Sequence, residues 1–248
     1  MCYSTALRKE EEEIRREMRR KGMVVNFGVG LEYTPYYHLN GFSRGNLYII
    51  KMDEPESIYP ATWGLVPDYA LDRPDDFWKK ANTLNARGEN IFETMSFRGS
   101  ADDKRCLILA DGFYEPHHEN GVAQPYFCYQ PTDEYKEGGL FLFAGLYNGL
   151  DTDFYTKLYT TTILTVEANP FFSEIHNKKK RMPLVLDSNY YEDWLDSGLS
   201  RQSVGEIIAT GFTEMEFKAH PVSRDLYKKG IDTNRPYIVE PVQKDTLF

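Results

Sequence analysis

The amino-acid sequence predicts a mixed α+β fold that is dominated by strands. Short segments rich in β-branched and aromatic residues recur along the 248 residues and are bounded by Gly, Pro and Asp. Segments with helical periodicity are fewer and short. No repeat, low-complexity linker or change in composition divides the sequence, so we expect one domain over residues 1–248.

The first expected element is a charged helix at about residues 7–22, ended by Gly22. Glu11 and Arg15 form a favourable i,i+4 pair on it, and a second such pair stands one residue further along. Because the segment has very little apolar surface, we expect a solvated helical insertion at the surface of the protein.

Five strands and four further short helices are expected after this insertion. The strands are expected at residues 47–51, 106–110, 126–130, 140–146 and 160–166. The helices are expected at residues 75–82, 168–175, 189–195 and 200–210. A serine at the start of the last of these stretches is a favourable helix N-cap.

The charge balance restricts how this protein can bind nucleic acid. With 29 Lys and Arg against 38 Asp and Glu, the formal net charge is −9, which argues against binding by bulk positive charge. A nucleic-acid site must therefore be a local patch. Outside the charged helix, the dense basic cluster lies at residues 178–181.

Length and composition also give expectations about compartment and cofactors. The longest apolar run, residues 140–147, is far shorter than the roughly 20 residues of a membrane-spanning helix. The first residues contain no apolar export segment, so we expect a cytoplasmic protein. Cys2, Cys106 and Cys128 are odd in number and lack metal-ligand spacing, so we expect no disulfide framework, no metal and no organic cofactor.

Cys2 directly follows Met1, so removal of Met1 places a thiol and an α-amine on one residue. The reference pKa of an α-amine is about 7.7–8.0, so a useful fraction is unprotonated near neutral pH. Such an amine attacks an aldehyde, and the neighbouring thiol can close the imine into a durable thiazolidine ring. The same pair also suits hydrolysis, as nucleophile and base. Taken alone, a cysteine at position two is more often incidental.

Five further residues have side chains suited to chemistry or binding, each with a simpler alternative. Asn85 and Arg87 suit a phosphate or carboxylate, or belong to a loop held by its own hydrogen bonds. Glu115 ends the apolar segment CLILADGFYE and suits a general acid or base, or is an exposed strand-end acid. His176 is a candidate proton shuttle or a polar surface residue. Trp63 is a base-stacking platform or a core aromatic.

The order and wording of several motifs resemble the SOS response-associated peptidase (SRAP) family. The shared motifs are MC at the start, WGLVP, NAR with ETMSFR, RCLILADGFYE, FAGLY, TILTVEAN, and IH followed by RMP. They span nearly the whole chain, and four or more ordered motifs argue against chance similarity. The resemblance implies a mixed sheet or open barrel with flanking short helices.

The resemblance also implies a function. Cys2, exposed by removal of Met1, forms a thiazolidine with the ring-opened aldehyde of an abasic site in single-stranded DNA and shields the lesion at replication forks. Asn85 then orients the Cys2 amine. Glu115 acts in Met1 removal and as proton acceptor and donor during crosslinking and its reversal. His176 assists ring opening and leaving-group protonation.

The DNA contacts implied by the family are assigned in the same way. Arg87 contacts a phosphate and Thr165 completes the pocket, while Trp63, Lys180 and Arg181 are further expected DNA contacts. We expect a monomer that acts at the nucleoid, with abasic single-stranded DNA as its partner and no membrane association.

Three departures from the family pattern bear on this transfer. MCGR becomes MCYS, so a phosphate contact from the fourth residue is absent, and basic residues of the charged helix are candidates to replace it. HxRMP becomes HNKKKRMP, and the longer spacing between His176 and Arg181 puts the place of Arg181 in question. GFYEW becomes GFYEP, so Pro116 replaces an aromatic residue.

Two other functions remain open at this point. One is an N-terminal-nucleophile cysteine peptidase or amidohydrolase, which needs no aldehyde. The other is a reversible single-stranded DNA-binding module that uses Trp63, Arg87 and residues 178–181 and does not need Cys2.

Overall fold

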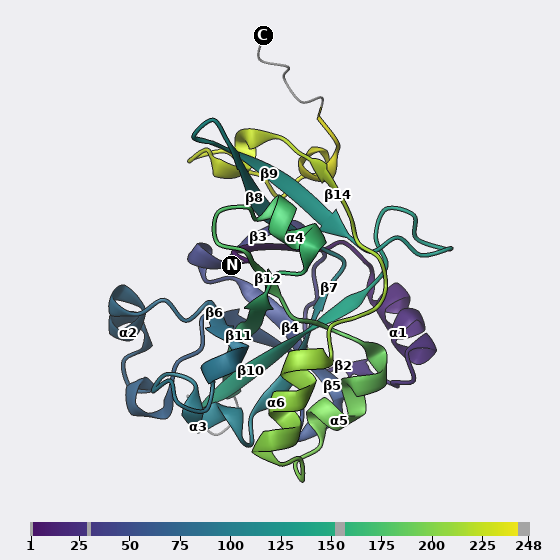
Figure 1. Cartoon of the computed structure of the whole chain (residues 1–248). Helices are drawn as coiled ribbons and strands as arrows, with labels where there is room; N and C mark the ends of the chain where they lie inside the picture. Colours follow the sequence, from purple (N-terminus) through teal and green to yellow (C-terminus); the bar gives the residue numbers. More distant parts are fainter. Residues whose placement is uncertain (1, 29–30, 152–156, 243–248) are drawn as a thin grey trace.

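The computed structural model describes residues 2–28, 31–151 and 157–242, whose strands form two sheets with short helices around them (Figure 1). The strands are β1 (Ser4–Leu7), β2 (Asn26–Phe27), β3 (Tyr36–Asn40), β4 (Asn46–Lys51), β5 (Glu54–Trp63), β6 (Asn85–Arg87), β7 (Arg105–Ala110), β8 (Gly112–Glu119), β9 (Val122–Tyr129), β10 (Phe141–Asp151), β11 (Lys157–Glu167), β12 (Arg181–Pro183), β13 (Val185–Leu186) and β14 (Lys218–Pro221). The α-helices are α1 (Glu11–Arg20), α2 (Pro74–Lys80), α3 (Arg98–Ala101), α4 (Pro170–Ile175), α5 (Tyr191–Leu195) and α6 (Arg201–Thr210). The 3₁₀ helices are η1 (Gly41–Ser43), η2 (Asp68–Ala70), η3 (Gly88–Asn90), η4 (Ser188–Tyr190), η5 (Arg224–Tyr227) and η6 (Pro236–Val239).

The larger sheet closes on itself. Its strands run in the order β12-β11-β10-β7-β4-β5-β2, and β5 also pairs in parallel with β11, so five of these strands form a ring. The parallel pairs β2–β5, β5–β11 and β6–β11 stand beside antiparallel ones. Ile49, Ile108 and Phe143, from three strands of the ring, are fully buried in the main core. The expected strand-dominated α+β fold is confirmed.

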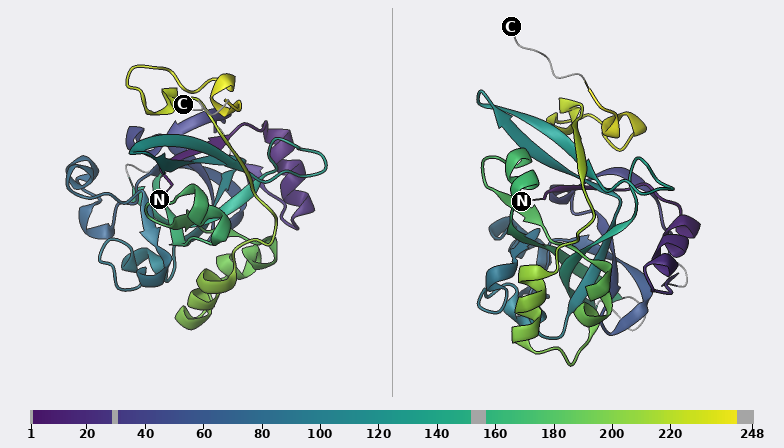
Figure 2. Two further views of the ribbon diagram at one scale, coloured as in Figure 1. Left: turned by 45° about the horizontal axis from the view of Figure 1, so that its top comes forward. Right: turned by 45° about the vertical axis from the view of Figure 1, so that its right-hand side comes forward.

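The smaller sheet holds the beginning of the chain. Its order is β14-β9-β8-β1-β3, so β1 lies between two partners. Ser4 pairs with Asn40 of β3, and Thr5 pairs with Phe113 of β8. The chain enters β1 beside α4 in Figure 1 and in both views of Figure 2. Cys2, two residues before this strand, is buried within the fold.

All five expected strands are present, as β4, β7, β9, β10 and β11, and the expected helices correspond to α2, α4, η4 with α5, and α6. Ser200 caps α6 by accepting from the Ser203 backbone N–H, as expected. The strands β1, β3, β5 and β8 were not expected. In β5, Pro55 and Pro60 weaken the strand pattern because proline cannot donate to a ladder. Among the described residues, no helix is both long enough and apolar enough to cross a bilayer.

The charged segment at residues 7–22 differs from the prediction. Leu7 ends β1, and the helix α1 begins only at Glu11. Ile14 and Met18, four residues apart and so on one helix face, are both fully buried in the main core. The helix lies at the surface as expected, but the expectation that it is solvated all round is wrong, because Ile14 and Met18 pack one of its faces against the core.

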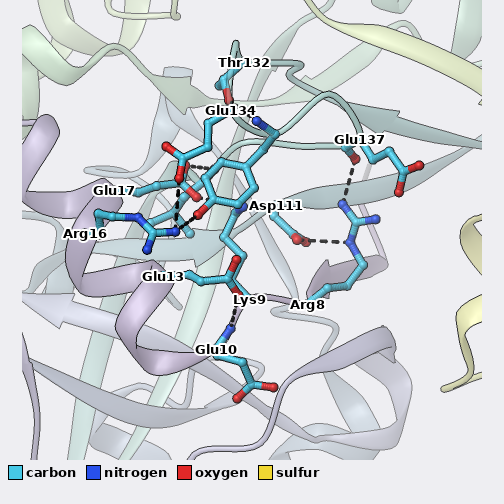
Figure 3. A network of polar contacts seen from close by, with 12 residues as sticks. Arg8, Lys9, Glu10, Glu13, Arg16, Glu17, Asp111, Thr132, Glu134 and Glu137 are labelled. Carbon is cyan, nitrogen blue, oxygen red and sulfur yellow. Dashed lines mark hydrogen bonds and ion pairs between the residues drawn. The ribbon is translucent and has the colours of Figure 1, made fainter.

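Ion pairs bind α1 to the segment that precedes it and to the loop between β9 and β10 (Figure 3). Lys9 Nζ lies 2.7 Å from Glu17 Oε1, both side chains are nearly buried, and the same ammonium lies 3.3 Å from the centre of the Tyr135 ring. On the outer side, Arg16 pairs with Glu134 at 3.2 Å. The charges that suggested a solvated helix are thus used to attach it to the rest of the protein.

Candidate active site

Cys2 lies two residues before the first residue of β1 and is held by the neighbouring backbone. The Gly41 backbone N–H donates to the Tyr3 carbonyl at 2.9 Å, which fixes the chain one residue after Cys2. Cys2 is fully buried, and its thiol donates to the Ser4 carbonyl at 3.6 Å. The pairing of β1 with β3 and β8 thus places the start of the chain in one defined position.

Asn85 holds the backbone of Cys2 from a second direction. Asn85 begins β6, which pairs with β11 through Ile163. Its Nδ2 donates to the Cys2 carbonyl oxygen at 2.7 Å. Its Oδ1 is buried and accepts no hydrogen bond within the described residues. An amide that holds the Cys2 carbonyl with one end therefore has an acceptor left at the other.

Glu115 and His176 form a buried acid–imidazole pair. Glu115 is in β8, two residues after Phe113, and is fully buried. His176 follows the end of α4 and is 4% exposed. Its Nδ1 lies 3.0 Å from Glu115 Oε2 and 3.1 Å from the Arg181 carbonyl oxygen. The fold thus brings together residues that are 61 positions apart in the sequence.

The electrostatic environment keeps the Cys2 thiol protonated. Burial raises the pKa of the Cys2 thiol well above its ordinary value, and the charge of Glu115 raises it further. Burial and the same carboxylate also raise the pKa of the Cys128 thiol. At neutral pH neither cysteine is a thiolate, so Cys2 lacks the low pKa of a cysteine activated as a nucleophile.

The two arginines expected to bind DNA differ in their surroundings. Arg87 ends β6, two residues after Asn85, is exposed, and forms no ion pair within the described part of the chain. Arg181 donates to both carboxylate oxygens of Glu89, at 2.6 and 2.9 Å, and to the Thr165 carbonyl at 2.5 Å. Arg87 is available to a phosphate, whereas Arg181 is already engaged.

Trp63 and Thr165 lie inside the protein. Trp63 is fully buried and its Nε1 donates to the Leu84 carbonyl at 2.8 Å, so its ring offers no face to a base. The expected stacking role of Trp63 is wrong, and the core alternative holds. Thr165 is also fully buried and its Oγ1 donates to the Ala86 carbonyl at 3.2 Å, so its side chain is not accessible from the surface.

A turn absorbs the extra residues that precede Arg181. The Lys180 backbone N–H donates to the His176 carbonyl at 3.0 Å, and Lys180 has φ 48°, a left-handed conformation that is uncommon for a side-chain-bearing residue. Arg181 then begins β12 and pairs with Glu167 of β11. Arg181 therefore lies beside His176 despite the longer loop, and the exposed Lys180 side chain is on the outer side of the turn.

Two features of this region were not found from the sequence. The Tyr3 and Phe42 rings lie 5.0 Å apart next to Cys2, and Phe42 is 60% exposed. The sequence could have suggested Tyr3 only through its place after Cys2. Glu89 follows Arg87 by two residues, but nothing in the sequence connects it to Arg181, 92 residues away. The described residues contain no cluster of three or more His, Cys, Asp and Glu side chains that could hold a metal ion.

Comparison with known proteins identifies the family of this chain. Abasic site processing protein YoaM from Bacillus subtilis (strain 168) is 34% identical over 165 residues, which cover 66% of this chain and 67% of that protein. Abasic site processing protein HMCES from Rattus norvegicus is 32% identical over 164 residues, which cover 57% of this chain and 45% of that protein. A crystal structure of a protein from Bacteroides thetaiotaomicron covers 98% of this chain and 100% of its own, with 29% identity and a TM-score of 0.77. Finally, the family model "SOS response associated peptidase (SRAP)" matches residues 1–229, so the chain belongs to the SRAP family.

Proposed function

We propose that this protein captures abasic sites in single-stranded DNA by a covalent bond to Cys2, after removal of Met1. The observation that carries the proposal is the arrangement around Cys2: its carbonyl is held by Asn85, and the Glu115–His176 pair lies in the adjoining strand and helix end. The relatives YoaM and HMCES are named abasic site processing proteins, which supports this substrate.

The reaction needs proton transfers that these residues can supply. The Cys2 amine attacks the aldehyde carbon of the ring-opened sugar and forms a carbinolamine. Loss of water then gives an imine. The thiol sulfur adds to the imine carbon and its proton passes to the nitrogen, so the balanced products are a thiazolidine and one water. Glu115 accepts the proton that leaves the amine, and the imidazole of His176 protonates the departing oxygen.

Glu115 also serves the step that prepares the protein. Removal of Met1 is the hydrolysis of one peptide bond, which consumes one water and leaves the Cys2 amine free. A buried carboxylate next to Cys2 suits a base for that water. The Asn85 Oδ1 atom then accepts from the new amine and orients it.

The raised pKa of the Cys2 thiol favours aldehyde capture over a cysteine hydrolase. A hydrolase with Cys2 as nucleophile needs the thiolate, which burial and Glu115 disfavour. In aldehyde capture the amine reacts first, and the protonated thiol brings the proton that the ring nitrogen requires. The raised pKa of the Cys2 thiol therefore disfavours hydrolysis with Cys2 as nucleophile and suits aldehyde capture.

Two surface features account for single-stranded DNA as the partner. Arg87 contacts the backbone phosphate beside the lesion, because its guanidinium is exposed and unpaired within the described structure. Tyr3 and Phe42 take the role first assigned to Trp63 and stack on the neighbouring base. Such stacking needs a base that is free of a partner strand.

The proposal is tested with purified protein, abasic single-stranded DNA and a denaturing gel. Wild-type protein forms a shifted band, Cys2→Ala forms none, and intact mass shows that Met1 is absent. A Cys2→Ser variant forms a far weaker band, because an alcohol closes a much less stable ring. No band with wild type, or retention of Met1, overturns the proposal. DNA binding that survives Cys2→Ala and leaves no band indicates the reversible binding module.

A further inference from the structure

We propose that Glu89 is a positioning residue, which holds His176 in one tautomer through Arg181. This inference rests on the proposed function, since it concerns how the same site is kept ready. Nothing in the family comparison assigns a role to Glu89. Glu89 is an exposed carboxylate that touches none of the reacting groups.

The proton position on His176 follows from its neighbours. The Arg181 carbonyl oxygen, 3.1 Å from His176 Nδ1, can only accept a hydrogen bond. Glu115 Oε2, 3.0 Å from the same nitrogen, is an acceptor when ionised. Nδ1 must therefore carry the proton, so in the neutral ring Nε2 is the basic nitrogen. The Arg181 carbonyl accepts the hydrogen bond from Nδ1, so its displacement would weaken the preference for this state.

Glu89 fixes the residue that supplies this carbonyl. The Arg181 guanidinium donates to Oε1 and Oε2 of Glu89 at 2.6 and 2.9 Å, a bidentate pair. The Arg181 side chain is 15% exposed, and its guanidinium also donates to Thr165. The side chain is thus held on two sides, and in the proposal this clamp acts together with the β11–β12 ladder to keep the backbone carbonyl in place.

The same short segment also reaches Cys2. Glu89 lies in η3, four residues after Asn85, which donates to the Cys2 carbonyl. One stretch of chain therefore holds Cys2 through Asn85 and His176 through Glu89 and Arg181. A rigid link between the two groups keeps amine and imidazole in a constant relation, and small misplacements of reacting groups are costly to the rate.

A competing reading makes the opposite prediction. Arg181 was expected from the family resemblance to contact DNA, and in this structure Glu89 occupies its guanidinium. If Glu89 only masked a phosphate-binding arginine, its removal would strengthen DNA binding and speed capture. If Glu89 positions His176, its removal slows capture and leaves binding little changed. Whether removal of Glu89 speeds or slows capture therefore distinguishes the two explanations.

The test compares Glu89→Gln, Glu89→Asp and the control Glu167→Gln. Glu167 is an exposed carboxylate that faces Arg181 across the β11–β12 ladder and forms no ion pair within the described residues, so its variant removes an equal charge without the clamp. The crosslinking rate is measured at saturating abasic DNA, and affinity is measured with single-stranded DNA that carries a non-reactive tetrahydrofuran abasic analogue.

We expect Glu89→Gln to lower the saturated rate about tenfold, Glu89→Asp to restore most of it, and Glu167→Gln to stay within about twofold of wild type. The ¹⁵N NMR signals of the His176 ring, recorded without DNA, should report Nδ1–H in wild type and a tautomer mixture in Glu89→Gln. A faster rate or tighter binding in Glu89→Gln, or an unchanged tautomer, overturns the inference.

This design separates the inference from the proposed function. If wild-type protein forms no crosslink, the proposed function fails, while the NMR signals still decide whether Glu89 sets the His176 tautomer. If wild type crosslinks and Glu89→Gln matches Glu167→Gln in rate and NMR signals, the inference alone fails.

Discussion

The region around Cys2 and the region around α1 both bury polar groups, but they do so in different ways. At α1, Lys9 pairs with Glu17 at 2.7 Å, and Arg8 pairs with Asp111 at 3.0 Å (Figure 3). At the start of β1, the polar groups are a thiol, an amide, a carboxylate and an imidazole, with an exposed arginine nearby.

The difference separates attachment from chemistry. Matched charges such as Lys9 and Glu17 hold one segment of the chain to another. A protonated thiol and an acid–imidazole pair can each give or take a proton, and an amide with a spare acceptor can orient an amine. Breaking the first region should therefore affect stability, and breaking the second should affect reaction.

The largest expected effect comes from removing the buried cation at α1. Lys9→Met leaves Glu17 buried without its partner, and we expect the free energy of unfolding to fall by about 3–5 kcal/mol, measured by urea denaturation. Arg15→Ala, which breaks exposed pairs with Glu11 and Glu12, should cost under about 1 kcal/mol. Folded Lys9→Met should still crosslink abasic DNA. Equal costs for both variants would contradict the structural role of the network.

His38 provides a pH-dependent effect in the strand beside β1. Its Nε2 lies 3.0 Å from Ser4 Oγ and its Nδ1 lies 2.6 Å from Thr233 Oγ1, and burial lowers the pKa of His38 to about 4. The unfolded chain, with a pKa near 6.5, binds the proton more readily, so stability falls as pH drops from about 6.5 to 4 and is constant below. The loss is about 3 kcal/mol.

His38→Gln should remove most of this slope. The check is a series of urea denaturation curves from pH 7.5 to 4 for both proteins. Stability that falls equally in wild type and His38→Gln would show that other groups carry the acid sensitivity.

At the site, Glu115→Gln should lower the crosslinking rate about a hundredfold, because the proton acceptor is lost while the shape is kept. The melting temperature should change far less than in Lys9→Met. Because Glu115 is also the proposed base for Met1 removal, Met1 is first removed from the variant by an added methionine aminopeptidase and its absence is verified by intact mass. The rate is then read from a denaturing gel over time. A normal rate in Glu115→Gln with Met1 absent would exclude Glu115 from the capture step.

Phe42→Ala should weaken binding to single-stranded DNA containing the tetrahydrofuran analogue by about tenfold, since stacking on an aromatic ring contributes about 1–3 kcal/mol per base. Val24→Ala, at another strongly exposed apolar residue, serves as control. A DNA in which both neighbours of the lesion also lack bases should bind wild type and Phe42→Ala equally. A difference that persists on that DNA would argue against stacking.

The smallest expected effect distinguishes a free arginine from a paired one. Arg87→Ala should weaken non-covalent DNA binding several-fold and reduce the slope of log affinity against log salt by about 0.7, the value for one phosphate contact on a single strand. Arg20→Ala, in the α1 network where Arg20 pairs with Glu134, should leave that slope unchanged. Equal slopes for both variants would remove Arg87 from the DNA surface.

The sequence predicted the parts of the fold that local pattern controls. The apolar, β-branched runs of β7 and β11 are buried on both faces and were expected as strands, and Ser200 marks the start of α6. The α1 segment was misjudged because its charge was abundant, while its apolar contact with the core comes from Ile14 and Met18. The proportion of charged residues in a segment does not show whether its few apolar residues share one helix face, and the packing of the helix depends on that face.

The sequence predicted which residues belong to the site better than it predicted how they are arranged. Cys2, Asn85, Glu115 and His176 were chosen from motif order, and the contacts of Asn85 and Glu115 join residues more than sixty positions apart. Trp63 could not be assigned from sequence, because its burial depends on a ring of strands formed by distant residues. Such long-range pairings leave no local signal.

The left-handed turn at Lys180 has a consequence for how this surface can vary. Because the turn leads the chain into β12 at Arg181, substitutions of the exposed side chains at residues 178–180 are expected to leave the imidazole of His176 in place. If these side chains contact DNA as proposed, their contribution to affinity can vary independently of the proposed reaction.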